Sequence, residues 1–134
     1  KLIEDRDDES LREYLKRIEP GTASVVHEYH FNAFNTKASG VEVVVPDNPT
    51  KDERNAAQEI CDAYSKIMGI PNRGVKTESQ SKRSKLALMR EEGINLLTEV
   101  CFIDNQIDIN AYQTNKSKLA EITADILVKY DNLY

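Results

Sequence analysis

The stretch NLLTEVCFI, residues 95–103, is mostly apolar and contains a single charged side chain, that of Glu99. Apolar runs of this length are typical of strands that a sheet buries on both faces. We therefore predict a buried strand here, and the rest of the chain is interpreted around it.

Two more strands are predicted upstream. Ala23–Val26 is apolar and β-branched and leads into HEYH, residues 27–30, while VEVVV, residues 41–45, follows a glycine. The polar stretch NRGVKTESQSKRS, residues 72–84, is expected to be a loop with a short extended piece around Val75. The segment LALM, residues 86–89, fits either a strand or a helix.

Helical periodicity marks three further segments. One lies before Pro20-Gly21, one starts at the capping box Thr50–Glu53 and ends at Gly69, and one fills the tail from Lys116. Their apolar stripes are Leu11, Tyr14, Leu15 and Ile18; Ala56, Ala57, Ile60, Cys61, Tyr64, Ile67 and Met68; and Leu119, Ile122, Ile126 and Tyr130. Strands alternating with helices predict an α/β fold with a mostly parallel sheet.

The composition argues against some classes of function. The 134 residues fit one domain, and a net charge of -5 argues against non-specific nucleic-acid binding, which needs clustered cations. The one basic run, SQSKRSK at 79–85, is expected to be a solvated loop.

Cys61 and Cys101 are too far apart for a CxxC motif and are expected to be buried thiols. We expect no membrane span and no signal peptide, because no apolar run is long enough.

Glu99 is an anomaly, because a carboxylate inside an apolar strand costs several kcal/mol unless it is paired. Two structural explanations are open: an edge strand with Glu99 in water, or a buried ion pair with an arginine such as Arg90. The functional explanation is a general base or metal partner near the carboxyl end of a strand, where open α/β sheets place their sites.

The chain's two histidines, His27 and His30, lie in the stretch HEYHFNAFN. Because side chains alternate along a strand, Glu28 and His30 share one face and His27 takes the other. The two imidazoles therefore cannot bind one metal from a regular strand. Taken alone, His30 is either a structural histidine or a metal ligand, and the local sequence leaves both open.

Four segments in this order, HFNA (30–33), GVEV (40–43), NRGVK (72–76) and TEVCFIDN (98–105), resemble the zinc-dependent N-acetylmuramoyl-L-alanine amidases of the amidase-3 type. The resemblance runs from about Asp5 to the last helix, and the last two segments resemble bacteriophage endolysins more than periplasmic amidases. It implies a three-layer α/β fold of the phosphorylase/hydrolase-like kind, with a mostly parallel sheet flanked by helices, a zinc cofactor and a peptidoglycan substrate. The bond cleaved would join N-acetylmuramic acid to the L-alanine of the stem peptide.

The resemblance also implies roles for residues. His30 falls on the family's zinc-binding histidine and Glu99 on its catalytic glutamate, while His27 has no counterpart. Asn32 is expected to orient the loop after His30, and Glu28 is a tentative ligand or substrate contact. Arg73 and Lys76 are expected to contact anionic groups of the substrate, with a solvated loop as the alternative.

The family's other two zinc ligands, a histidine and a glutamate, would lie upstream of Lys1. We therefore expect residues 1–134 to be one amidase-like catalytic domain that lacks the first strand and helix, with a missing N-terminal segment or a wall-binding domain as partner. As an endolysin it would stay in the host cytoplasm until lysis and then reach the cell wall. A non-catalytic binding or regulatory module and a zinc peptidase acting within the stem peptide are the alternatives.

Overall fold

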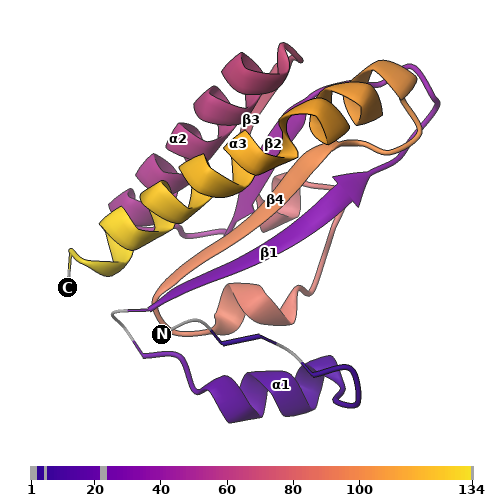
Figure 1. The fold of residues 1–134 in the computed structure, drawn as a ribbon. Coiled ribbons are helices and arrows are strands. Elements are labelled where there is room, and N and C mark those ends of the chain that lie inside the picture. Colours follow the sequence, from indigo (N-terminus) through magenta and orange to yellow (C-terminus); the bar gives the residue numbers. More distant parts are fainter. Residues whose placement is uncertain (1–2, 5, 22–23, 134) are drawn as a thin grey trace.

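A computed structural model describes residues 3–4, 6–21 and 24–133 and shows a sheet between two helical layers (Figure 1). The elements are α1 (Leu11–Ile18), β1 (Val25–Asn32), β2 (Val41–Val45), α2 (Lys51–Met68), β3 (Asn72–Thr77), the 3-10 helices η1 (Glu78–Gln80) and η2 (Ala87–Arg90), β4 (Ile94–Phe102) and α3 (Gln106–Asp131). This arrangement confirms the predicted α/β class.

The sheet has four strands in the order β1-β4-β2-β3. The pairs β1/β4 and β2/β3 are parallel and the pair β2/β4 is antiparallel, so the sheet is mixed but mostly parallel, as expected. The predicted strand over 95–103 is β4, and all of its residues are buried because strands flank it on both sides.

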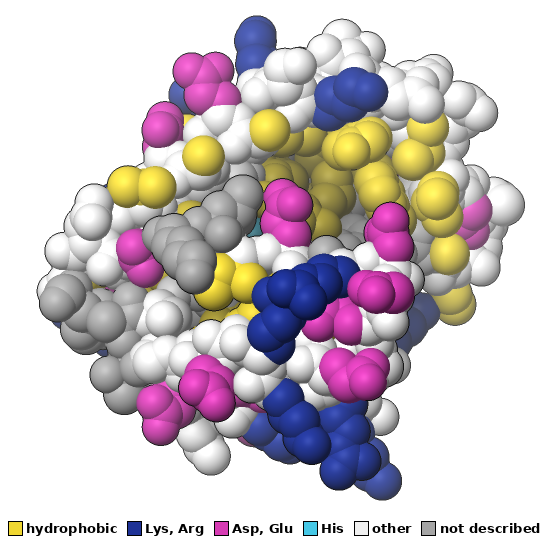
Figure 2. Space-filling model, turned by 60° about the horizontal axis from the view of Figure 1, so that its bottom comes forward, with side chains coloured by type: hydrophobic (Ala, Val, Ile, Leu, Met, Phe, Trp, Pro, Cys, Tyr) yellow, Lys and Arg dark blue, Asp and Glu magenta, His cyan; other side chains and the backbone are white. Residues whose placement is uncertain are grey.

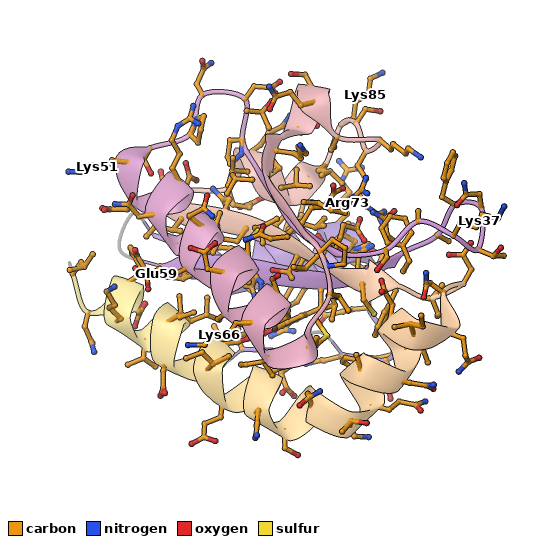
Figure 3. The ribbon with its side chains drawn as sticks, turned by 90° about the horizontal axis from the view of Figure 1, so that it is seen from above. Lys37, Lys51, Glu59, Lys66, Arg73 and Lys85 are labelled. Atoms are coloured by element: carbon orange, nitrogen blue, oxygen red, sulfur yellow. The ribbon has the colours of Figure 1, made fainter. Side chains whose placement is uncertain are left out.

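Two hydrophobic clusters hold the layers together. The larger one packs α2 and α3, which lie side by side (Figure 3), against one face of the sheet, with Ile60, Leu96 and Ile126 inside it. The smaller one lies on the other face, where Leu97 packs against Leu88 of η2 and, at its margin, Leu15 of α1. Burial of each such side chain contributes roughly 1.5–3 kcal/mol.

The helix ends follow the predicted signals. Thr50 and Glu53 form the expected capping box, in which the Thr50 N–H donates to Glu53 at 2.8 Å and the Glu53 N–H donates to Thr50 at 3.1 Å. The helix α2 ends at Gly69, whose φ of 66° is a left-handed conformation that glycine adopts without a steric cost.

Two predictions about elements need correction, and one open alternative is decided. Residues 72–77 form the edge strand β3 and not a loop; its polar residues reach solvent, and Gly74, with a φ of 80°, lies at a shift in register against β2. The segment around Leu88 is a 3-10 helix. The helix α3 begins ten residues earlier than Lys116, at Gln106, because Asn105 caps it by accepting from two backbone amides. Ala23 lies outside the described residues.

Cys61 and Cys101 are free and buried, as predicted. Burial raises the pKa of each thiol to about 12, so neither is a reactive thiolate at neutral pH. Within the described ranges, no helix combines the length and apolar character that crossing a bilayer requires.

Candidate active site

Three charged or titratable side chains form a row across the sheet on the face opposite α2 and α3. His30 of β1 is in register with Glu99 of β4, and Glu99 is in register with Glu42 of β2. Residues paired across adjacent strands point to the same face. On the same face, Leu97 and Val44 belong to the smaller hydrophobic cluster, so the row borders an apolar floor.

Glu99 is 2% exposed and lies on the central strand, which rules out the edge-strand explanation. Its partner is an arginine, as the second explanation required, but it is Arg83 and not Arg90. Arg90 lies instead near Glu78, at 3.4 Å. Arg83 Nε donates to Glu99 Oε1, while Glu99 Oε2 is buried and has no hydrogen-bond partner among the described residues.

Glu28 lies beside His30 on the same face of β1. Its Oε1 atom is 2.6 Å from His30 Nε2, a hydrogen-bonding distance. A carboxylate on one ring nitrogen fixes the orientation and tautomer of an imidazole and leaves the other nitrogen, here Nδ1, as a lone-pair donor. The pair is therefore suited to hold a metal ion through His30, with Glu28 orienting the ring.

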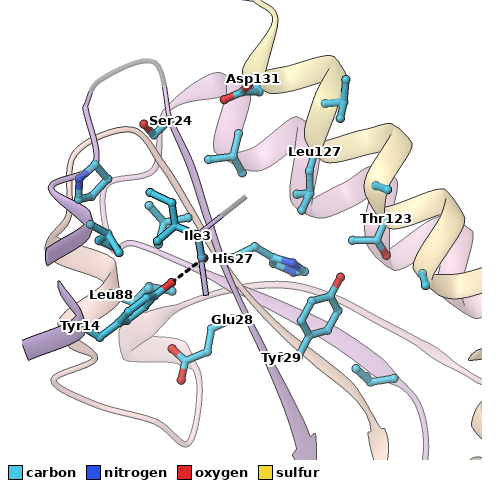
Figure 4. A pocket seen from close by; sticks show the side chains of 18 of the residues that line it. Ile3, Tyr14, Ser24, His27, Glu28, Tyr29, Leu88, Thr123, Leu127 and Asp131 are labelled. Atoms are coloured by element: carbon cyan, nitrogen blue, oxygen red, sulfur yellow. Dashed lines mark hydrogen bonds between the residues drawn. The ribbon is translucent and has the colours of Figure 1, made fainter. Parts of the chain in front are cut away.

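His27 points the other way, toward α3, while Glu28 points away from it (Figure 4). The His27 ring contacts the Thr98 hydroxyl at 2.8 Å and packs edge-on against Tyr29. Burial lowers the pKa of His27 to about 4, since a charged imidazole would lose its hydration there. The ring is therefore neutral at physiological pH.

This lowered pKa predicts a pH-dependent stability. In the unfolded chain the His27 imidazole takes up a proton near its ordinary pKa of 6.5, and in the folded chain only near 4. The contribution of His27 to the free energy of unfolding is therefore largest above pH 6.5 and is lost as the pH falls toward 4. The full difference corresponds to about 3 kcal/mol. Urea unfolding of wild type and His27→Gln between pH 7 and pH 4.5 measures it, and the free energy of unfolding of the wild type should fall relative to that of His27→Gln by most of this difference at the acidic end. Curves that stay parallel would contradict the assignment.

The other predicted residues surround Glu42. Asn32 Nδ2 donates to Glu42 Oε1 at 3.4 Å, and Arg73 Nε lies 3.3 Å from Glu42 Oε2. The Arg73 guanidinium also stacks over the Phe102 ring, with 5.1 Å to its centroid. Arg73 is thus already engaged by a carboxylate and a ring, whereas Lys76 on β3 is in register with Val44 and is partly buried.

Two aspartates that the sequence interpretation missed fix the loops at this end of the sheet. Asp104 Oδ2 accepts from the backbone amides of Phe34 and Thr36, both at 3.0 Å. Asp108, in the first turn of α3, is buried and accepts from the Phe102 amide at 2.9 Å. Hydrogen bonds therefore hold the turn after His30 against the segment that follows Glu99. Asp108 follows the Asn105 cap by three residues, a helix-start signal that was visible in the sequence.

The described residues do not complete a metal site. Across the described ranges, no group of three His, Cys, Asp or Glu side chains is placed to hold a metal ion. A catalytic zinc site needs three protein ligands and a water, a set that these residues do not supply.

A hollow of about 1060 Å³ lies along the free edge of β1. The strand supplies His27, Tyr29 and Phe31 to one wall, and α3 supplies Thr123 and Leu127 to another (Figure 4). Figure 2 shows a hollowed face with hydrophobic side chains gathered inside it. Since β1 pairs only with β4, its other backbone edge is unpaired within the described sheet.

The fold matches solved amidase structures. The catalytic domain of the CD27L endolysin that targets Clostridia difficile superposes with a TM-score of 0.69 at 24% identity, over 86% of this chain and 59% of that one. The catalytic domain of CwlV, an N-acetylmuramoyl-L-alanine amidase from Bacillus (Paenibacillus) polymyxa var. colistinus, gives 0.70 at 18% identity, over 93% and 67%. AmiC2 of Nostoc punctiforme, another such amidase, gives 0.68 at 18% identity, over 90% and 65%. At these identities the matches establish the fold, which is that of an amidase catalytic domain.

The sequence establishes the family. Residues 1–128 match the model of the amidase-3 family, the N-acetylmuramoyl-L-alanine amidases, and the chain belongs to that family. This confirms the resemblance drawn from the four motifs. No curated protein matches the chain by sequence. The chain spans 59% of the CD27L catalytic domain and about two thirds of the CwlV domain, at 67%.

Proposed function

We propose that this chain is the main part of a peptidoglycan amidase that hydrolyses the amide between N-acetylmuramic acid and the L-alanine of the stem peptide. The observation that carries the proposal is the position of Glu99. This buried side chain of β4 is in register with His30 of β1, and one of its oxygens has no hydrogen-bond partner among the described residues. The family membership supports the substrate class. From the resemblance of the motifs we further propose a phage lysis enzyme, held in the host cytoplasm until lysis and then acting on the cell wall.

In this mechanism Glu99 is the general base. Its Oε2 atom takes a proton from the attacking water and then delivers that proton to the departing amine of L-alanine. Burial excludes competing water from the carboxylate, and Glu28 fixes the ring of His30. We propose zinc as the cofactor, with His30 as a ligand and the remaining ligands from a segment outside these 134 residues. When bound, zinc polarises a carbonyl and lowers the pKa of a water.

The hollow beside β1 is the place that we propose for that segment. An added strand would satisfy the unpaired backbone edge of β1 and would cover apolar side chains of both β1 and α3. The chain spans 59% of one solved neighbour and 67% of another, so these neighbours have further residues of the length that this proposal requires. Side chains of this segment would supply the remaining metal ligands next to His30.

This arrangement predicts that the 134 residues alone bind zinc weakly and do not hydrolyse peptidoglycan. The reason is that the described residues supply fewer than the usual three protein ligands. A strand and helix taken from the CD27L catalytic domain, added in trans or joined to the chain, should raise both zinc content and turnover. Zinc analysis after gel filtration measures the first and release of soluble peptidoglycan the second. Stoichiometric zinc in the isolated chain would contradict the proposal and would make Glu28 and His27 the candidate ligands.

Product analysis tests the bond that is cleaved. Digestion of purified peptidoglycan should release stem peptides with a new amino-terminal L-alanine and should produce no new reducing sugar ends. A different new amino terminus would instead identify a zinc peptidase acting within the stem.

One observation favours a second candidate, a binding or regulatory module. It is the incomplete ligand set of the described residues. Such a module would sediment with peptidoglycan and stay inactive even after the missing segment is added and zinc is bound.

A further inference from the structure

Arg83 contacts the buried side chain of Glu99. It lies between η1 and η2, in the basic run expected to be a solvated loop, yet its Nε atom donates to the buried Oε1 of Glu99. The Glu99 side chain is 3% exposed and the Arg83 side chain 32%, so the guanidinium covers the carboxylate from the solvent side. Among the described residues this is the one ion pair that Glu99 makes.

The contact determines what each oxygen of Glu99 can do. Arg83 occupies Oε1, and Oε2 is buried without a partner in the described part of the chain. When one oxygen of a carboxylate is held by a charge-assisted hydrogen bond, the plane of the group is fixed and the direction of the second oxygen with it. Oε2 therefore keeps its acceptor capacity and a defined direction.

The segment that carries Arg83 is held at both ends. At its start, the Ser79 amide and hydroxyl both donate to Asp47 Oδ1, at 2.8 and 2.7 Å. At its end, Leu88 and Met89 are buried in the smaller hydrophobic cluster. The guanidinium is therefore presented to Glu99 by an anchored loop and not by a free one.

We propose that Arg83 is a positioning residue for amide hydrolysis. Its guanidinium fixes the orientation of the Glu99 side chain, with Oε2 aimed at the reacting water and the departing amine. This inference rests on the proposed function of Glu99 as general base.

The test is a set of Arg83 variants in the protein that hydrolyses peptidoglycan. Arg83→Ala should lower kcat by about 10–100-fold, the usual effect of losing a group that orients a site residue, and should leave KM unchanged. Added methylguanidinium, at concentrations that do not unfold the protein, should restore part of the lost turnover. Arg83→Lys, which keeps the charge but loses the planar donor, should lie between wild type and Arg83→Ala.

Lys82→Ala is the matched control. It removes a positive charge from the adjacent position, where Lys82 Nζ lies 3.6 Å from the centre of the Phe34 ring and not on Glu99. Its kcat should equal that of wild type. An effect of Lys82→Ala as large as that of Arg83→Ala would show that only the charge or fold of the loop matters, and it would overturn the proposal.

A spectroscopic measurement keeps the proposal testable if Arg83→Ala does not fold. In the isolated chain, the Arg83 Nε–H signal, assigned through its absence in Arg83→Lys, should be shifted downfield and protected from exchange, and Glu99→Gln should abolish both effects. A freely exchanging Nε–H in the wild-type chain would overturn the proposal. An active Glu99→Gln would remove the proposed function and this inference together, whereas an inactive Glu99→Gln beside a fully active Arg83→Ala would remove this inference alone.

Discussion

Glu99→Gln should abolish peptidoglycan hydrolysis by the complete enzyme while leaving its fold and zinc content intact. The substitution keeps the shape of a side chain that is 2% exposed, and it removes the carboxylate that we propose as the proton acceptor. Loss of a general base typically costs 10²–10⁴-fold in rate. Release of soluble peptidoglycan measures the rate, and far-UV circular dichroism and metal analysis check the fold and the zinc.

Glu53→Gln is the control for this experiment. Glu53 is a second buried carboxylate, 3% exposed, which accepts from the Asn95 amide at 3.0 Å at the start of β4. Glutamine keeps only one of the two acceptor oxygens that Glu53 offers to the Thr50 and Asn95 amides, so this variant should lose stability. The folded protein should nevertheless keep its activity, because Glu53 does not border the row that contains Glu99. Near wild-type lysis by Glu99→Gln would refute the catalytic assignment.

The row of side chains that contains Glu99 was only partly predictable from the sequence. A lone charge in an apolar run made Glu99 conspicuous, and the alternation of side chains along a strand separated His27 from His30. Glu42 carries a similar signal inside VEVVV but was not singled out. Arg83 had no local signal, because it reaches Glu99 from a loop sixteen residues away along the chain.

The fold was predictable where burial dictates the pattern and less so at its margins. Both buried strands, β2 and β4, are apolar, and α2 has a regular stripe and a capping box. The edge strand β3 is polar because part of it faces solvent, so its residues resemble a loop. The antiparallel pairing of β2 with β4 depends on contacts between distant segments, which no local pattern encodes.

His30→Ala should release zinc from the complete enzyme, whereas His27→Ala should retain it. His30 lies in register with Glu99 and next to Glu28, while His27 lies on the opposite face against Thr98. Loss of a ligand should weaken zinc binding by more than the 10–100-fold that loss of an outer-shell partner costs, and Glu28→Gln should fall within that smaller range.

Competition with a chromogenic chelator measures all three affinities on one scale. His27→Ala serves as the matched control, since it removes an imidazole three residues away on the same strand. Its cost should appear as lowered stability, because the Thr98 hydroxyl loses its partner. Equal zinc loss in His27→Ala and His30→Ala would mean that both rings reach the metal, and the alternation of side chains along β1 would then not describe the bound state.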